Sequence, residues 1–246
     1  MAVRKRVDPV MSRQVLREYA EQSLLLGAPA ETFRYRLLSP PRIEAGVLYP
    51  VIVYLHGAGE RGDDNQQQLV YLPELMIRPE RRRAYPCFLI APQCGQRCWW
   101  SDKSPGQEIS FYLEAVMAML DAVLSSQPAD PERVYATGIS MGGFGVWDLA
   151  GQFTDRLAAA VPICGGGAER TAPRLTELPI WAWHGDQDEA VPVRYSRRMI
   201  EAIRQAGGHP RYTELKGVGH DSWTPVYEND GLMEWMFAQR RTVRHR

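Results

Sequence analysis

The sequence predicts an α/β fold: a doubly wound, mostly parallel sheet flanked by helices. Three observations lead to this prediction. Several short segments are apolar at nearly every position, which is typical of strands buried on both faces of a parallel sheet. Amphipathic segments with helical spacing lie between them. The chain has 246 residues and no internal repeat or flexible linker, so a single large α/β domain accounts for its length.

Seven segments are predicted to be strands. Five of them are almost entirely apolar: 49–57, 87–93, 133–140, 158–166 and 179–185. The segment 32–40 alternates between apolar and polar residues, which favours an edge or antiparallel strand. A late strand is expected at 210–217.

The predicted helices lie between these strands. In the segment 107–124 apolar residues recur at steps of four and three, which forms one apolar helix face. The segment 195–206 repeats the pattern, and 226–239 is expected to form a closing helix. Asp130 and Pro131 predict a break before the strand that follows them.

The two ends of the chain are expected to lie outside the domain. Residues 1–30 form an N-terminal extension in this interpretation, with a short helix between Val10 and Leu26. Residues 31–240 form the single domain, and 241–246 form a basic tail.

Charge and hydropathy exclude several classes of protein. Lys plus Arg number 29 and Asp plus Glu number 29, so the net charge is zero, which argues against a protein that coats nucleic acid. No apolar run approaches the ~20 residues that span a bilayer. The charged start of the chain is not followed by the hydrophobic stretch of a secretory signal. We therefore expect a cytoplasmic protein without nucleic-acid or membrane partners, in which neutrality permits self-association without requiring it.

The four cysteines do not indicate a disulfide scaffold or a metal site. They are few and scattered: Cys87, Cys94, Cys98 and Cys164. Cys94 and Cys98 lack a second Cys or His pair at zinc spacing. Free thiols are the expectation, and a local Cys94–Cys98 bridge is the alternative.

The sharpest chemical signal is G-I-S-M-G at 138–142, which directly follows a predicted strand and precedes a helical pattern. A nucleophile on such a tight turn occupies strained backbone space, and Gly138 and Gly142 relieve the crowding around Ser140. The helix that follows directs its N-terminal amides toward a developing oxyanion. This context predicts Ser140 as a nucleophile.

A serine hydroxyl reacts poorly until a base takes its proton, so a histidine is required. Five are available, and His220 follows the last strand, which gives the chain order serine, acid, histidine of such hydrolases. His56 is given a structural role, and His184 is expected to order a loop. His209 and His245 are expected at the surface.

The third member must be a carboxylate that orients the imidazole. Three acids follow the strand 179–185, at the sheet edge where α/β ligand sites lie. Asp188 is the choice. Asp186 is the alternative, although it is expected to bond its own turn, and Glu189 is expected to be solvated.

An oxyanion hole needs two backbone donors. The N–H of Met141, directly after the nucleophile, is expected to be one. The other is expected from the Gly-rich loop 56–62, at Ala58 or alternatively Gly59. That loop matches neither a P-loop nor a dinucleotide fingerprint, which disfavours phosphate binding.

Together these segments resemble the α/β-hydrolase superfamily, in its carboxylesterase/phospholipase and dienelactone-hydrolase-like branch. Within it the chain is similar to small esterases labelled "predicted peptidase", which grade into feruloyl esterases and polyhydroxybutyrate depolymerases. The resemblance covers about residues 32–235. It includes the segments YLHGAGERGDDN, APQ…WW, RVYATGISMGGFGVWDLA, PIWAWHGDQDEAVP and GVGHDSW. It implies Ser140 as nucleophile, Asp188 as acid and His220 as base, in agreement with the residue-level choice.

The pocket can be outlined from the loops. The segment from Gly165 to Leu178 is too short to hold a cap domain, so an open site suited to soluble short-acyl esters is expected. Trp99, Trp100 and Trp223 flank the motif segments and would wall an acyl or aromatic group; core packing is the alternative for each.

The resulting functional prediction is a serine carboxylic-ester hydrolase that works through an acyl-enzyme, on short-chain or aryl/cinnamoyl-type soluble esters. It requires no metal or organic cofactor. One alternative keeps the triad and cleaves short peptides. Another is a hydrolase-fold protein that only binds a ligand or partner.

Overall fold

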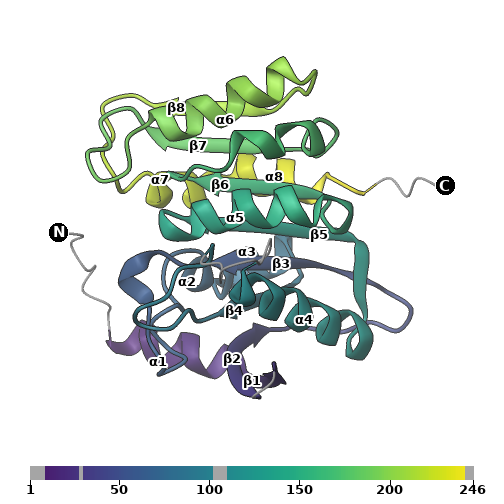
Figure 1. The fold of residues 1–246 in the computed structure, drawn as a ribbon. Coiled ribbons are helices and arrows are strands. Elements are labelled where there is room, and N and C mark those ends of the chain that lie inside the picture. Colours follow the sequence, from purple (N-terminus) through teal and green to yellow (C-terminus); the bar gives the residue numbers. More distant parts are fainter. Residues whose placement is uncertain (1–8, 28–29, 102–109, 242–246) are drawn as a thin grey trace.

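The computed structural model describes residues 9–27, 30–101 and 110–241. They form one eight-stranded sheet with the order β1-β2-β4-β3-β5-β6-β7-β8 (Figure 1). The strands, in chain order, are β1 (Tyr19–Leu26), β2 (Glu31–Leu38), β3 (Tyr49–Leu55), β4 (Phe88–Pro92), β5 (Ala129–Ile139), β6 (Ala159–Ile163), β7 (Trp181–Gly185) and β8 (Arg211–Leu215). From β4 to β8 all neighbouring strands run parallel. The predicted doubly wound, mostly parallel sheet is confirmed.

All seven predicted strands are present. Every residue of β3 and β4 is buried, which explains why these segments are apolar throughout. The alternating segment forms β2, which pairs antiparallel with both β1 and β4. It is therefore an antiparallel strand, as the alternation indicated, but an interior one.

The prediction of a helix from Val10 to Leu26 is correct only in its first part. A helix, α1, covers Pro9–Glu18, and the chain then enters β1. All eight residues of β1 pair with β2, so residues 19–26 belong to the sheet and not to an extension outside it. Pairing with a neighbouring strand overrides the local helical pattern here.

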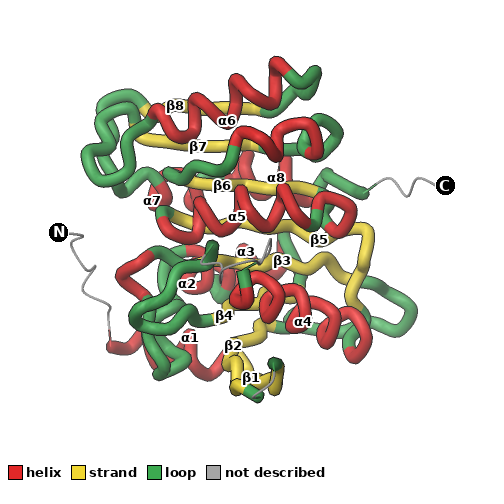
Figure 2. The backbone as a smooth tube through the Cα atoms, viewed as in Figure 1, coloured by secondary structure: helices red, strands yellow, loops and turns green. Residues whose placement is uncertain are grey.

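Helices cover both faces of the sheet, as Figures 1 and 2 show. They are α1 (Pro9–Glu18), α2 (Leu72–Met76), α3 (Pro79–Ala84), α4 (Phe111–Ser126), α5 (Met141–Gln152), α6 (Arg194–Gln205), α7 (Trp223–Glu228) and α8 (Asp230–Phe237). One apolar core lies between the sheet and α4, α5 and α6. A second lies on the opposite face, beneath α1, α2, α7 and α8. The fold is thus a three-layer α/β sandwich.

Two predicted boundaries differ from the structure. The expected single helix 226–239 is two helices, α7 and α8, because Asn229 interrupts the first and caps the second by accepting the N–H of Gly231. Asp130 and Pro131 lie inside β5, where the register between β5 and β3 shifts. The expected break is therefore an irregularity within the strand.

The segment between β6 and β7 contains only a short 3-10 helix, Glu169–Arg174, and the described part of the chain contains no cap domain. None of the four cysteines forms a disulfide, so Cys94 and Cys98 are not bridged. No helix within the described ranges has the length and apolar character needed to cross a membrane. Most of the predicted basic tail, 242–246, lies outside the described residues.

Candidate active site

Ser140 occupies a sharp turn between the end of β5 and the start of α5. Its backbone has φ 52° and ψ −115°, a conformation that non-glycine residues rarely adopt. Such a conformation costs about 1–3 kcal/mol and persists only where the surrounding structure enforces it. The turn therefore exposes one serine side chain at the carboxyl edge of the sheet, as the strand–turn–helix pattern predicted.

Two glycines make this turn sterically feasible. A β-carbon at Gly138 would lie 2.6 Å from the carbonyl oxygen of Gly142 and 2.7 Å from that of Leu55. A β-carbon at Gly142 would overlap the carbonyl oxygen of Leu55. The start of α5 thus sits directly on the end of β3, and any larger side chain would separate them.

The structure brings the three predicted side chains into one hydrogen-bonded chain. Nε2 of His220 lies 3.0 Å from Oγ of Ser140, and Nδ1 lies 2.7 Å from Oδ2 of Asp188. Asp188 follows β7 and His220 follows β8, so both loops leave the same edge of the sheet as the Ser140 turn. The Asp188 carboxylate is buried, and its Oδ1 accepts the N–H groups of Ala190 and Val191 at 2.9 and 2.8 Å.

The hydrogen-bond partners fix the protonation pattern of His220. A carboxylate only accepts, so Nδ1 of His220 carries the hydrogen that bonds to Asp188. In the neutral imidazole Nε2 is then an acceptor, and it faces the hydroxyl of Ser140 at 3.0 Å. This arrangement can withdraw a proton from the serine oxygen.

The other acids of the same loop lie elsewhere. Oδ1 of Asp186 accepts the N–H of Gly217 at 2.7 Å, which fastens the loop after β7 to the one after β8. Glu189 is exposed. The sequence-based preference for Asp188 over Asp186 therefore agrees with the geometry.

The two expected oxyanion donors lie on neighbouring segments. Met141 is the first residue of α5, so its N–H has no partner within the helix. Ala58 begins a short 3-10 turn, Ala58–Glu60, and its carbonyl accepts from Nε of Arg61 at 3.0 Å. Leu55, three residues earlier, pairs with Gly138 across β3 and β5. The two donor segments thus leave adjacent strands at the same edge.

His56 links the start of the Ala58 loop to the loop after β4. It is fully buried, and its Nε2 accepts the N–H of Cys94 at 2.9 Å. Nδ1 therefore carries the hydrogen, which bonds to the carbonyl of Gly57 at 2.6 Å. Burial lowers the pKa of His56 to about 4, so the ring is neutral near pH 7. This is the structural role that the sequence predicted.

The three tryptophans differ in their surroundings. Trp100 is only 1% exposed and donates its indole N–H to the carbonyl of His56 at 3.0 Å. It is a core residue, so the prediction that it lines the pocket is wrong. Trp99 is 46% exposed, with the Arg61 guanidinium 5.6 Å from its ring centroid. Trp223 packs edge-on against the His220 ring, with centroids 5.1 Å apart.

Sequence reasoning missed Tyr71. Its backbone, with φ 62° and ψ −109°, resembles that of Ser140, and its ring lies 5.5 Å from that of Trp223. Burial raises its pKa to about 12, so the phenol is protonated at neutral pH. Strained residues of this kind cluster at functional sites, and the ring contacts link Tyr71 through Trp223 to His220. No local motif signals this position.

One group of potential metal ligands occurs among the described residues. The Cys164 thiol, the Asp188 carboxylate and the His220 imidazole place ligand atoms within 4.8 Å of one another. Two of these groups are hydrogen-bonded to each other. Burial strongly raises the pKa of the Cys164 thiol, so the thiol is protonated at neutral pH in the metal-free protein. The contact between His220 and Asp188 fits acid–base chemistry.

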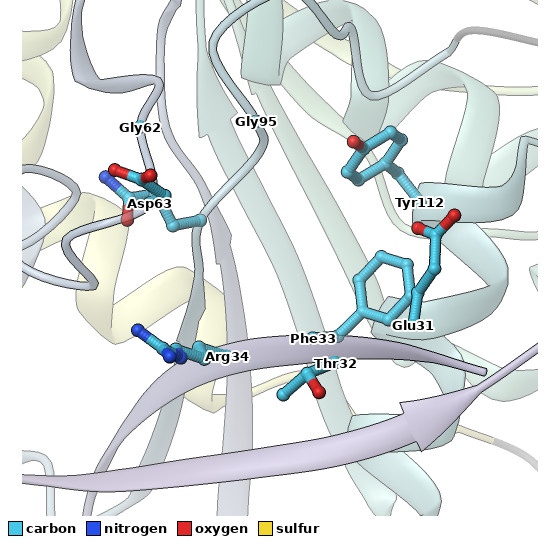
Figure 3. Close-up of a pocket in the computed structure, with 9 residues that line it drawn as sticks. Glu31, Thr32, Phe33, Arg34, Gly62, Asp63, Gly95 and Tyr112 are labelled. Carbon is cyan, nitrogen blue, oxygen red and sulfur yellow. The ribbon is translucent and has the colours of Figure 1, made fainter.

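A cavity of about 340 Å³ lies beside the start of β2 (Figure 3). It is lined by the start of β2, two loops and α4: Glu31, Thr32, Phe33, Arg34, Gly62, Asp63, Gln93, Gly95 and Tyr112. Neither the Ser140–His220–Asp188 group nor any tryptophan contributes to it.

Comparison with known families gives the family of the chain. Residues 92–222, just over half of the chain, match the model of the dienelactone hydrolase family. The chain belongs to the dienelactone hydrolase family. The match spans Ser140, Asp188 and His220 together. It agrees with the resemblance seen in the sequence.

Solved and curated relatives of this dienelactone hydrolase family member include esterases. A crystal structure described as a thermostable esterase superimposes with a TM-score of 0.86 and 34% identity; the match covers 93% of this chain and 64% of the esterase. The poly(3-hydroxyoctanoate) depolymerase of Pseudomonas fluorescens is 28% identical over 54% of this chain and 53% of its own length. A probable inactive carboxylesterase of Oryza sativa subsp. japonica is 23% identical, over 75% of this chain and 82% of its own.

The chain thus spans less than two thirds of the esterase and about half of the depolymerase. The matched family is a hydrolase family, and the relatives named above include an esterase and a depolymerase.

Proposed function

We propose that this protein hydrolyses soluble carboxylic esters through an acyl-enzyme, with Ser140 as nucleophile, His220 as base and Asp188 as the orienting acid. One observation carries the proposal. His220 lies within hydrogen-bond distance of both Ser140, at 3.0 Å, and Asp188, at 2.7 Å, and Ser140 itself occupies a strained turn at the start of a helix. Each of these features also occurs singly in proteins without a reactive serine, but their combination is what a serine nucleophile requires.

The reaction follows from these contacts. As Oγ of Ser140 attacks the ester carbonyl carbon, Nε2 of His220 takes the hydroxyl proton. The C=O electron pair moves onto the carbonyl oxygen, where the N–H groups of Met141 and Ala58 stabilise the charge. The tetrahedral intermediate expels the alkoxide, which takes the proton from His220 and leaves as the alcohol. Water then attacks the acyl-enzyme by the same route and releases the acid.

We propose short-chain or aryl esters as the substrate class. No cap domain in the described part of the chain covers the Ser140 edge, which favours small soluble substrates over interfacial lipid. Trp223 is mostly buried, but its ring contacts both His220 and the partly exposed Tyr71; this aromatic group next to His220 suits an aryl or cinnamoyl-type group.

An activity panel tests the proposal. Purified protein would be assayed with p-nitrophenyl acetate, butyrate and octanoate, with methyl ferulate, and with aminoacyl p-nitroanilides. We expect ester turnover, fastest for short or aryl esters, with amides cleaved far more slowly. A preference for aminoacyl amides would favour the alternative of a serine peptidase. Absence of turnover on every substrate, together with no reaction with a fluorophosphonate, would indicate a hydrolase fold that only binds.

A further inference from the structure

A second histidine contacts the carboxylate that orients His220. His184 is the fourth residue of β7 and is fully buried. Its Nε2 lies 3.3 Å from Oδ2 of Asp188, the same oxygen that lies 2.7 Å from Nδ1 of His220. Sequence reasoning gave His184 only the ordering of a loop. The structure therefore places two imidazoles on one carboxylate oxygen.

The neighbours of His184 determine which of its nitrogens carries hydrogen. Nε2 also lies 2.8 Å from the carbonyl oxygen of Val191. Carbonyl and carboxylate oxygens only accept, so Nε2 is protonated; its hydrogen bonds to the Val191 carbonyl, and Oδ2 of Asp188 is the second acceptor within 3.3 Å. Burial lowers the pKa of His184, which favours the neutral ring with a bare Nδ1. The single hydroxyl hydrogen of Ser196 is shared between that Nδ1 and the carbonyl oxygen of Gly165, each 2.8 Å from Oγ.

These contacts join four segments around Asp188. Ser196 belongs to α6 and also lies 2.8 Å from the carbonyl of Gly165, beyond β6. On β8, Glu214 is in register with His184, and its carboxylate is bound by Arg197 of α6 at 2.7 Å. Glu214 is thereby neutralised by its own partner. Asp188 and the Val191 carbonyl remain as the acceptors for Nε2 of His184.

The result is a carboxylate with donors on both oxygens. Two backbone N–H groups hold Oδ1, and two imidazoles reach Oδ2. The backbone donors fix one oxygen, but rotation of the carboxylate would still move the other. His184 is buried and His220 is partly exposed, and both lie next to Oδ2. The contact with the buried His184 therefore restrains rotation of the carboxylate.

We propose that His184 is a positioning residue, whose Nε2–H holds Oδ2 of Asp188 in place for His220. This role rests on the proposed function, because it acts through the Ser140–His220–Asp188 triad. Enzyme activity falls when the contacts that position a reacting group are removed. In metal sites, loss of a residue that orients a metal ligand lowers activity by about ten- to a hundredfold, and we expect a loss of similar size here.

Two conservative substitutions separate the two ends of the ring. His184→Gln places an amide near the position of Nε2 and can still donate to Asp188. His184→Asn places its amide near Nδ1, so it keeps the Ser196 contact and withdraws from Asp188. We expect kcat on p-nitrophenyl butyrate to fall about ten- to a hundredfold in the asparagine variant and only a few-fold in the glutamine variant, with KM little changed in both.

A double-mutant cycle distinguishes positioning from general loss of structure. In an Asp188→Asn background the contact has lost its target, so adding His184→Asn should reduce kcat less than twofold further. A purely structural role would reduce kcat by the same factor in both backgrounds. Thermal unfolding of all variants shows whether lost activity follows lost stability. If His184→Asn does not fold, His184→Gln replaces it in the cycle. The same comparison, with and without Asp188→Asn, is then made with a smaller expected change in kcat.

Two further results would overturn the proposal in different ways. If wild-type protein cleaves esters and reacts with a fluorophosphonate at Ser140, but His184→Asn retains wild-type kcat, His184 has no positioning role and the proposed function stands. If wild-type protein neither cleaves esters nor reacts at Ser140, the proposed function fails, and the role of His184 fails with it.

Discussion

Gly142 lies so close to the carbonyl oxygen of Leu55 that a β-carbon on Gly142 would overlap it. This contact seats the first turn of α5 on the end of β3. Because Met141 begins α5 and Ala58 follows β3, the same contact sets the separation of the two expected oxyanion donors. Packing of backbone against backbone thus sets the distance between the two loops that border the site.

Gly142→Ala should therefore destabilise the protein although alanine is the better helix former. We expect the free energy of unfolding to fall by about 3 kcal/mol or more, since a backbone segment must move to admit the methyl group. Urea unfolding measures the change. Gly59→Ala is the matched control, because a β-carbon there would meet no atom within 4 Å. Equal stability of the two variants would contradict the tight contact.

Asp188→Asn should abolish most activity without unfolding the protein. The amide would favour the wrong tautomer of His220, and the corresponding change in serine proteases lowers kcat about 10⁴-fold. Steady-state kinetics on p-nitrophenyl butyrate measure the effect. Asp186→Asn is the control: asparagine can still accept the N–H of Gly217, so kcat should stay near that of the wild type. Comparable losses in both variants would argue against Asp188 as the acid.

Acid should destabilise the fold through His56. Its pKa is lowered to about 4 in the folded protein, below the ~6.5 of an unfolded chain, so the unfolded state binds more protons between these values. Stability therefore falls as pH drops through this window, by about 2 kcal/mol from pH 7 to pH 5 for this group alone. The lowered pKa of His184 acts in the same direction.

Urea unfolding at pH 7 and pH 5 tests this dependence. His56→Gln should reduce the difference between the two pH values, whatever its effect on absolute stability, and leave the part that His184 contributes. His209→Gln, at an exposed histidine, should leave the difference as in the wild type. If His56→Gln retains the full difference, His56 is not its source.

Tyr71→Ala should change the preference among substrates more than the basal reaction. Its ring packs on Trp223, and aromatic pairs contribute about 0.5–1.5 kcal/mol, or roughly two- to twelvefold in kcat/KM. We expect such a loss for methyl ferulate and a smaller one for p-nitrophenyl acetate. Tyr85→Ala is the control, because that ring pairs with Phe237. Equal losses on both esters would exclude Tyr71 from the aryl subsite.

The sequence predicted those features whose signal is local. Strands buried on both faces are apolar throughout, and G-I-S-M-G at 138–142 combines a steric requirement with a strand before it and a helix after it. Features that depend on partners were missed or misplaced. β1 is a strand because β2 lies beside it, and the break at Asn229 depends on a cap that closes a turn.

The same distinction holds within the site. Chain order and strand ends were enough to choose Ser140, Asp188 and His220. They could not tell that Trp100 turns into the core, since that depends on the His56 carbonyl to which it donates. Nor could they show that His184 reaches Asp188, because that contact depends on the path of the loop between them.

The most direct test of Ser140 as the nucleophile is the reaction of a fluorophosphonate probe with wild-type protein and with Ser140→Ala, followed by intact-protein mass and ester turnover. We expect one probe adduct on the wild type, mapped to Ser140. The variant should remain folded, acquire no adduct and lose turnover by about a millionfold. A folded Ser140→Ala protein that still takes up the probe, or still cleaves the ester at a similar rate, would contradict the proposed mechanism at its centre.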